Sequence, residues 1–469
     1  MKFDKCGAVG RKAEETLDHF VGGEDRLRVA AKVALQTFTA QEQDRALKAN
    51  RLMERIVMPS NVQEACIRVI QNKGAPGIDD MPVTEIEAWF ALHGQKLAEQ
   101  LLAGTYEPQP VKCVTIPKPA GGLRELGIPR VIDRVVQQAM LIVLNGIINP
   151  TFSTFSYGFR PGIGAHDALK QAREYVKDGR VFVVDIDLEK FFDRVNHDVL
   201  MALVARRIDD KRVLRLIRAY LSAGIVLPNG LQIRSDTGTP QGGPLSPLLA
   251  NIMLDDLDKE LEKRGHKFCR YADDCNIYVR SQAAGERVFA SITAFLEKKL
   301  RLKVNTTKSA VALVNTRKFL GYTISLYGSF YIARQSIAQL KAKIRNITKR
   351  NRGVAISEVV EELNLRTPRW VRYFRFAECK KALEDLDAWI RRKLRCIRLK
   401  QCKKSFAIAK LLISRGLEPW QAWILAGSGK GWWRLAGSPQ AHRALSNAWF
   451  DEIGLKSLSF TYKMVYQSL

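Results

Sequence analysis

The feature that most constrains this chain is a pair of adjacent carboxylates, Asp273 and Asp274, inside the run "FCRYADDCNIYV" at residues 268–279. The residues on both sides of the pair are strand formers, so the run predicts a hairpin whose tight turn carries both carboxylates at its tip. Two unit charges about 4 Å apart repel by roughly 1 kcal/mol in water and about 4 kcal/mol at an effective dielectric near 20. A solvated turn is the plainest interpretation, and it must also account for any second acidic cluster in the chain.

Such a cluster follows another apolar strand, in "RVFVVDIDLEKFFDRVNHDVL" at 180–200. Asp185 and Asp187 alternate at a period of two, so they lie on one face of that strand. The chain then turns helical around Phe191, and the loop "TPQGGPLSP" at 239–247 lies between the two clusters. Carboxylates from separate strands suit two-metal phosphoryl transfer, because Mg²⁺ takes oxygen ligands from one or two carboxylates plus substrate phosphates.

The order of predicted elements from about 180 to 325 is β-α-β-β-α-β, the split βαβ arrangement. A helix is expected at 285–300, and the last strand is expected from "KFLGYTIS" at 318–325. A sheet of this kind holds Asp187 and Asp273 on adjacent strands.

A basic hairpin is predicted upstream of the acidic clusters. The run "VKCVTIPKPAGGLRELGIP" at 111–129 reads as two strands around a Gly-Gly turn, and it carries Lys118 and Arg124. Helical patterns are expected on either side of it, at 52–70 and 133–144. Solvated charges on an exposed hairpin are the alternative interpretation of the two cations.

The net charge makes a polyanion the first partner to consider. Among 469 residues, 75 Lys and Arg stand against 48 Asp and Glu, which leaves a net charge of +27, and the pI is near 9.8. Nucleic acid fits this balance best. We expect no membrane partner, since no stretch approaches the length of an uncharged membrane span and no secretory signal opens the chain. The eight cysteines form no C-x-x-C pair, so reduced thiols and a cytosolic location are expected.

Residues 333–404 form a basic module without strand signals. They hold 21 Lys and Arg against 7 Asp and Glu, a net charge of +14. Two apolar stripes at helical spacing, one beginning at Ile337 and one at Leu383, predict helices with basic residues on their other faces. A solvated surface over a helical core is the plain interpretation, but this charge exceeds what solubility requires. The cations predicted to bind RNA are Lys341, Arg345, Arg391, Arg392, Lys393 and Arg395.

Together these motifs resemble the reverse transcriptases encoded by bacterial group II introns, over about residues 50–330. "DIDLEKFFD" and "YADD" look like the two catalytic segments of that family, and "TPQGGPLSPLLAN" looks like its substrate-binding loop. "NKGAPGID", "IPKPAGGLRELGIP", "FSYGFRP" and "KFLGY" resemble its fingers, palm and primer-grip blocks, in the same order. The resemblance implies an α+β right-hand polymerase with fingers and a ferredoxin-like palm, followed by an all-helical basic thumb or maturase domain and a small C-terminal DNA-binding segment.

The implied parts follow one another along the chain. They are an N-terminal extension (1–49), fingers and N-terminal palm (50–180), catalytic palm (181–332), helical thumb or maturase domain (333–404) and C-terminal DNA-binding segment (405–469). Within the thumb, Arg369 stands where the family usually has Gly before the Trp of its signature, here Trp370. The last part is similar to the tail of the compact class C enzymes, so no Cys-rich His-Asn-His endonuclease domain is expected.

The resemblance also implies roles for single residues. Asp187, Asp273 and Asp274 would bind two Mg²⁺ ions, for which Mn²⁺ can substitute. The other implied site residues are Lys118 and Arg124 on the incoming triphosphate, Gln241 beside its sugar, Phe192 as a steric gate and Lys308 as general acid. Phe191 is the alternative candidate for the gate. Adjacent helical positions diverge by about 100°, so the two rings cannot both face the nucleotide. The implied partners are an RNA template and intron RNA, a DNA primer or target, and dNTPs. The implied location is a bacterial cytosol, with association with the nucleoid during DNA synthesis.

Three other functions stay open at this point. An RNA-dependent RNA polymerase shares the palm and its metals, but "PQGG" and "YADD" disfavour it. A maturase with a decayed polymerase site is disfavoured because all three aspartates are present. A host-adapted reverse transcriptase of the same ancestry, acting in DNA repair or phage defence, is compatible with the sequence. Folded intron RNA encoded around the reading frame would distinguish the intron enzyme from it.

Overall fold

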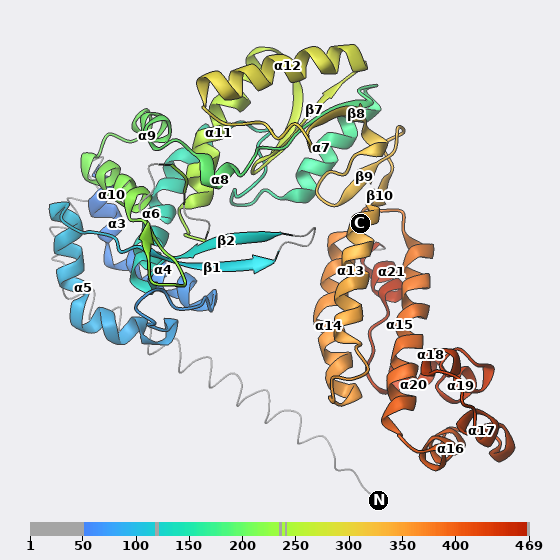
Figure 1. The fold of residues 1–469 in the computed structure, drawn as a ribbon. Helices are drawn as coiled ribbons and strands as arrows, with labels where there is room; N and C mark the ends of the chain where they lie inside the picture. The colour runs from blue at the N-terminus through green and yellow to red at the C-terminus, as the bar shows by residue number, and fades with distance from the viewer. Residues whose placement is uncertain (1–50, 118–121, 234–236, 240–241, 467–469) are drawn as a thin grey trace, which may run out of the picture. The chain divides into compact units, whose positions relative to one another are not determined.

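The computed structural model describes residues 51–117, 122–233, 237–239 and 242–466. They form two compact units. The first comprises the described residues up to Tyr175 together with Phe182–Ala312, and the second comprises Val176–Val181 and the described residues from Leu313 onward. Figure 1 traces the elements of both units along the chain.

The first unit contains a four-stranded sheet in the order β6-β7-β3-β8. Strand β3 (Phe182–Ile186) pairs antiparallel with β7 (Asp274–Val279), which pairs antiparallel with β6 (Lys267–Tyr271). Helix α11 (Ser246–Lys263) precedes β6, and α12 (Gln282–Lys299) follows β7 and packs on β3 and β7. The predicted β-α-β-β-α-β order is therefore confirmed, and the four strands lie in the order of a ferredoxin-like sheet.

The last strand of this sheet is not the one that we predicted. We expected it at 318–325, whereas β8 is Ala310–Leu313. At Leu320 and Gly321 the φ angles are +50° and +83°, and a regular strand cannot run through two successive left-handed residues. The residues after this turn instead form β9 (Tyr322–Ile324), which pairs with β10 (Phe330–Ile332) in a separate two-stranded sheet of the second unit.

A second sheet of the first unit has the order β2-β1-β4-β5. Strands β1 (Val111–Pro117) and β2 (Leu123–Ile128) form the predicted hairpin, and β4 (Ile225–Val226) and β5 (Gln232–Ile233) form a smaller one beside it. The remaining helices of this unit are α3 (Leu52–Val57), α4 (Pro59–Gln71), α5 (Ile86–Ala103), α6 (Val131–Ile148), α7 (Ala165–Lys177), α8 (Phe191–Arg194), α9 (His197–Ala205) and α10 (Lys211–Ser222), with single 3₁₀ turns at Val83–Glu85 and Asn149–Thr151. The helix predicted at 52–70 is divided in two because Pro59 begins a new helix at its first position.

Helix α6 is longer and more apolar than the helix predicted at 133–144. By length and composition it is the one helix in the described part of the chain that could cross a membrane, over Val131–Thr151 with a mean hydropathy of 1.5, but 67% of that window is buried inside the protein. It packs against α3 and α4 in a hydrophobic core that also contains Val184 and Ile277 of the central sheet. Its apolar character is therefore that of a core helix.

After β10 every regular element in the described part of the second unit is a helix, as the basic, strand-free composition predicted. These helices are α13 (Arg334–Ile347), α14 (Ile356–Tyr373), α15 (Lys380–Gln401), α16 (Ser405–Ser414), α17 (Pro419–Ala426), α18 (Trp432–Leu435), α19 (Pro439–Ala444), α20 (Asn447–Glu452) and α21 (Leu458–Tyr466). The β9–β10 hairpin is fastened to α14 by rings: Tyr322 packs against Phe330, Tyr373 and Phe374.

Candidate active site

The hairpin of β6 and β7 carries two aspartates at its tip, as its sequence predicted. Tyr271 pairs with Asp274, so Ala272 and Asp273 are the two turn residues and Asp274 begins β7. Ala272 has a φ of +58°, a left-handed conformation that costs an L-residue roughly 1–2 kcal/mol. Asp273 is half-buried and Asp274 is exposed. Both carboxylates are therefore open to a ligand.

Asp187 follows the last residue of β3 at the same end of the sheet. Ile186 pairs with Cys275, so Asp187 and Asp274 occupy the next position on two neighbouring strands. Asp185 pairs with Asn276 and lies one step further inside the sheet, on the same face as Asp187. The structure thus brings the two acidic motifs together at one end of the neighbouring strands β3 and β7.

Lys308 lies beside the first of these carboxylates. Its Nζ is 3.5 Å from Oδ1 of Asp187, and the two side chains are 66% and 31% exposed. The backbone of Asp187 is fixed by two hydrogen bonds that are shorter than this ion pair. The Asn305 N–H donates to the Asp187 carbonyl (2.8 Å), and the Asp187 N–H donates to Oγ of Ser309 (2.9 Å). Nothing in the sequence marks Ser309, which is buried and fixes the peptide of Asp187.

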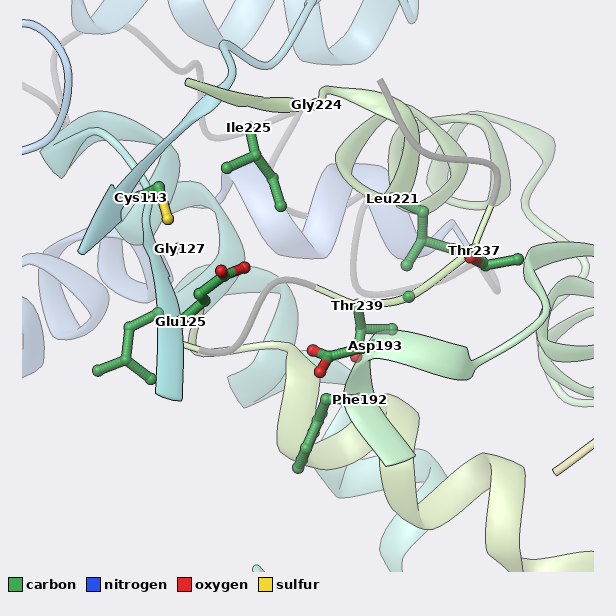
Figure 2. Close-up of a pocket in the computed structure, with 12 residues that line it drawn as sticks. Cys113, Glu125, Gly127, Phe192, Asp193, Leu221, Gly224, Ile225, Thr237 and Thr239 are labelled. Carbon is green, nitrogen blue, oxygen red and sulfur yellow. The ribbon is translucent and has the colours of Figure 1, made fainter. Parts of the chain in front are cut away.

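A pocket of about 170 Å³ lies between the β1–β2 hairpin and α8. Figure 2 shows Cys113 and Glu125 of the hairpin on one side of it, and Phe192 and Asp193 of α8 on another. The loop residue Thr239 also lines it, and its N–H donates to the carbonyl of Phe192 (2.6 Å). The walls thus come from the three motifs that were predicted to surround an incoming nucleotide, namely the hairpin, the "DIDLEKFFD" segment and, through Thr239, the "TPQGGPLSP" loop.

The two adjacent phenylalanines have different surroundings. Phe191 is 3% exposed and belongs to the hydrophobic core. Phe192 is half-buried and lines both the 170 Å³ pocket and a neighbouring pocket of about 580 Å³, which Arg134 and Phe159 also line. The rings are 5.1 Å apart and nearly perpendicular, at 72°. Of the two, Phe192 is the ring with access to a ligand.

Gly242 and Gly243 of the "PQGG" loop lie against the hairpin and α6, respectively. A Cβ added to Gly242 would stand 2.7 Å from the carbonyl oxygen of Gly127 in β2, and one added to Gly243 would stand 2.4 Å from the side-chain oxygen of Gln137. At Gly242, where the neighbouring atom is backbone and φ is +133°, only glycine allows this approach. Among the predicted nucleotide ligands, Arg124 lies in β2 opposite Ile116, whereas Lys118 and Gln241 lie outside the described residues.

Three of the predicted RNA-binding cations gather around two tryptophans of the second unit. Arg345 of α13 and Lys393 of α15 lie over the ring of Trp389, at 5.7 and 5.0 Å from its centroid. Arg392 and Lys393 lie over Trp433, at 4.3 and 5.9 Å. We call Lys341, Arg345, Arg391, Arg392 and Lys393 the cation array. In the described part of the chain no carboxylate lies within ion-pair distance of these five. Burial, reinforced by Arg345, lowers the pKa of Lys393.

Arg395 does not belong to this array, which corrects its predicted role. Its side chain is 4% exposed, its Nε donates to the carbonyl of Leu445 (2.8 Å), and its guanidinium lies 5.1 Å from the ring centroid of Phe450. Helix α15 is packed on more than one side, so more of its surface is buried than the single apolar stripe from Leu383 predicted. Burial lowers the pKa of Arg395 to about 10.

The aspartates at this end of the central sheet supply hard oxygen donors. Among the described residues no three His, Cys, Asp or Glu side chains already stand close enough to hold a metal ion. This arrangement suits Mg²⁺, which is bound by one or two carboxylates together with substrate phosphates rather than by an all-protein cage. Asp187, Asp273 and Asp274 therefore fit a divalent cation that arrives with a nucleotide.

Comparison with protein families gives two matches along the chain. The family described as "Reverse transcriptase (RNA-dependent DNA polymerase)" matches residues 116–324. The family described as "Group II intron, maturase-specific domain" matches residues 337–411. The first range contains both acidic motifs, and the second contains the cation array.

Similar proteins and structures include intron-encoded relatives. "Protein YkfC" of Escherichia coli is 35% identical over 346 residues, covering 64% of this chain and 90% of that protein. "Group II intron-encoded protein LtrA" of Lactococcus lactis is 37% identical over 223 residues, covering 47% of this chain and 36% of that protein. A solved "Partial Cas6-RT-Cas1--Cas2 complex" aligns at 27% identity and a TM-score of 0.35 over 53% of this chain and 43% of that one.

Proposed function

The chain belongs to the group II intron-type reverse transcriptases and maturases, a family of RNA-directed DNA polymerases, and we propose that it copies RNA into DNA at an active site formed by Asp187, Asp273 and Asp274. The observation that carries this proposal is the meeting of two acidic motifs, distant in sequence, at adjacent positions of β3 and β7. A copying site needs this convergence, because the attacking and leaving oxygens are stabilised together.

Divalent metals serve this family, and we propose two Mg²⁺ ions here, with Mn²⁺ as a substitute. When bound, such ions act as Lewis acids on the transferring phosphoryl group and favour the ionised primer hydroxyl. The chain's part is to hold the carboxylates in place before substrate arrives. The two strands do so through their ladder, and Ser309 and Asn305 do so through the peptide of Asp187.

Two further side chains have distinct tasks in the proposed reaction. Lys308, 3.5 Å from Asp187 and 66% exposed, can leave its partner and place a cation or proton on the pyrophosphate as it departs. Phe192 stands in the wall of the pocket and restricts the space on the 2′ side of the nucleotide sugar. Lys118 and Arg124 of the basic hairpin would hold the triphosphate, and Gln241 would border the sugar.

Primer extension tests the proposed function directly. The full chain is given a DNA primer annealed to an RNA template, with dNTPs and Mg²⁺, and in parallel the same primer on a DNA template and with rNTPs. Complementary DNA made on the RNA template is the expected product. No extension on RNA with either Mg²⁺ or Mn²⁺ would overturn the proposal, and preferential use of rNTPs would point to an RNA polymerase instead.

For the second unit we propose RNA binding, with intron RNA as the partner, through the cation array. Replacing Lys341, Arg345 and Lys393 by Gln is expected to weaken RNA binding and to flatten its salt dependence. Each phosphate contact contributes a slope of about −0.7 to −0.9 in log K against log salt, so the slope should fall in magnitude by about 2–3. Filter binding of a group II intron RNA at several salt concentrations measures it.

The chain offers a control with the same loss of charge. Lys381, Arg352 and Arg415 belong to the same unit, but each stands beside a carboxylate, of Asp385, Glu362 and Glu452 respectively. Their triple replacement by Gln should leave the slope nearly unchanged. Equal slopes for the two triple variants would show that net charge alone, and not this surface, holds the RNA.

A further inference from the structure

A buried arginine lies directly beneath the catalytic turn. Arg270 is the next-to-last residue of β6, two residues before the turn residue Ala272, and its side chain is fully buried at 0% exposure. Its charge is matched by Asp258 of α11, which is also fully buried. A buried ion pair at this depth requires an explanation, because it is costly to desolvate and adds little to stability when compared with apolar side chains.

Every N–H group of the Arg270 guanidinium has an acceptor. Nε and Nη2 donate to the two carboxylate oxygens of Asp258 (2.7 and 2.5 Å). Nη2 also donates to Oγ of Ser156 (2.7 Å). Nη1 donates to Oδ1 of Asn251 (3.0 Å) and to the carbonyl oxygen of Ala272 (2.9 Å). A guanidinium has five such donors in a rigid plane, so one side chain joins α11, the 155–158 segment and the turn.

The bond to Ala272 acts on the peptide that leads into Asp273. The carbonyl of Ala272 belongs to the peptide group whose nitrogen is that of Asp273, so the guanidinium sets the orientation of this peptide. Ala272 itself is in the left-handed conformation, which persists only where the surroundings enforce it. The hydrogen bond from Arg270 to the carbonyl of Ala272 is placed to hold this conformation.

A second contact holds the turn from another side. The Arg270 N–H donates to the carbonyl of Phe155 (2.9 Å), and the Tyr157 N–H donates to the carbonyl of Arg270 (2.8 Å), so this segment runs alongside β6. Asn251 donates to the carbonyl of Gly158 (2.9 Å). A Cβ at Gly158 would lie 2.2 Å from the Ala272 nitrogen. The turn is thus confined between the guanidinium and a backbone that approaches as closely as glycine permits.

We propose that Arg270 is a positioning residue for the polymerase reaction: together with Asp258 and Asn251 it fixes the turn so that Asp273 stands ready in its catalytic position before substrate binds. The inference rests on the proposed function of the aspartates and adds a purpose for the ion pair beneath them. Displacement of a reacting group by about 1 Å can cost on the order of 10²-fold in rate, so the structure gains speed, rather than stability, from this pair.

The decisive variant replaces the whole pair by apolar side chains, Arg270→Met with Asp258→Leu, so that no charge is left buried alone. We expect its thermal unfolding to stay near that of the wild type, because such exchanges are often neutral. Its kcat for dNTP addition on an RNA template should fall by about tenfold or more with KM for dNTP within about twofold, since the nucleotide pocket is untouched. That split between kcat and KM distinguishes positioning from a general loss of folded protein.

The matched control is a second ion pair of α11, between its buried Asp255 and the half-buried Arg207. Arg207 and Asp255 are 12% and 0% exposed at the side chain and 2.5 Å apart, and their contacts within the described residues do not include the turn. Arg207→Met with Asp255→Leu should leave kcat within about twofold. If the double variant at 270 does not fold, Asn251→Ala, which keeps the ion pair, should still lower kcat about fivefold.

Failure of this inference is distinguishable from failure of the proposed function. The positioning role is wrong if the wild type extends primers and Arg270→Met with Asp258→Leu keeps a kcat equal to that of the control. Where that double variant does not fold, the same result for Asn251→Ala shows that the role is wrong. A fall in kcat matched by the control pair would also overturn it. If the wild type itself makes no DNA on RNA, the proposed function is wrong.

Discussion

Replacing Asp273 by Asn is expected to lower the rate of primer extension by at least ~10³. The change keeps the shape of the turn residue but removes an anionic oxygen, and the loss corresponds to roughly 4 kcal/mol of transition-state stabilisation. Asp273 sits in the two-residue turn between β6 and β7, so the substitution disturbs neither strand. Single-nucleotide addition on an RNA template, followed by rapid quench, measures the rate.

Asp209→Asn is the matched control for this experiment, because Asp209 is an exposed aspartate outside both acidic motifs. Its rate should stay within about twofold of the wild type, as is usual for exposed positions away from special features. A rate for Asp273→Asn within tenfold of the wild type would contradict the assignment of the "YADD" turn as the catalytic segment.

The second large effect concerns the choice of sugar. Phe192→Val should raise incorporation of rNTP relative to dNTP on the order of 10²-fold, with dNTP incorporation largely kept. A gate of this kind acts by repulsion, since a 2′-hydroxyl pressed against a rigid ring costs overlap energy and loses its water partner. Phe192 is half-buried and in the wall of two pockets, so a smaller side chain there opens space without emptying the core.

Phe191→Val provides the comparison, from the adjacent position. Phe191 is 3% exposed in the core, so its truncation should lower the free energy of unfolding by about 2–4 kcal/mol and depress the use of both sugars equally. Competition between labelled dNTP and rNTP, with a thermal melt of each variant, separates the two outcomes. Relaxed sugar choice in Phe191→Val alone would mean that the register of Asp187 is misassigned.

The motifs of this chain were predictable where a local pattern and a tertiary requirement coincide. The strand formers around Asp273 and Asp274 leave only a tight turn between them, and the structure has that hairpin. The alternation of Asp185 and Asp187 places them on one face. In both cases the period of two belongs to the strand itself and does not depend on its neighbours.

Other features depend on partners that are distant in sequence, and these were missed. The segment at 318–325 has the composition of a strand, but its turn at Leu320 directs it to β10, and the short run Ala310–Leu313 closes the central sheet instead. Arg395 lies in a row of basic residues that looks uniformly exposed, yet helix α15 is covered on that side by residues around Leu445. Burial of a charged side chain is decided by what packs on it, and a single helix does not encode that.

The network around Asp187 also has a consequence for the timing of catalysis. The segment that carries Lys308 is joined to the catalytic strand at several points: Leu188 pairs with Val304, and the Glu189 N–H donates to the carbonyl of Lys303 (2.8 Å). This segment is therefore not free to act as a closing lid, so in its proposed role as general acid Lys308 would reach the leaving group by rotating its own side chain. Rotamer changes of exposed side chains take picoseconds to nanoseconds. In that role the lysine would be in place before the chemical step, and we expect any slow phase that precedes nucleotide addition to originate in another element.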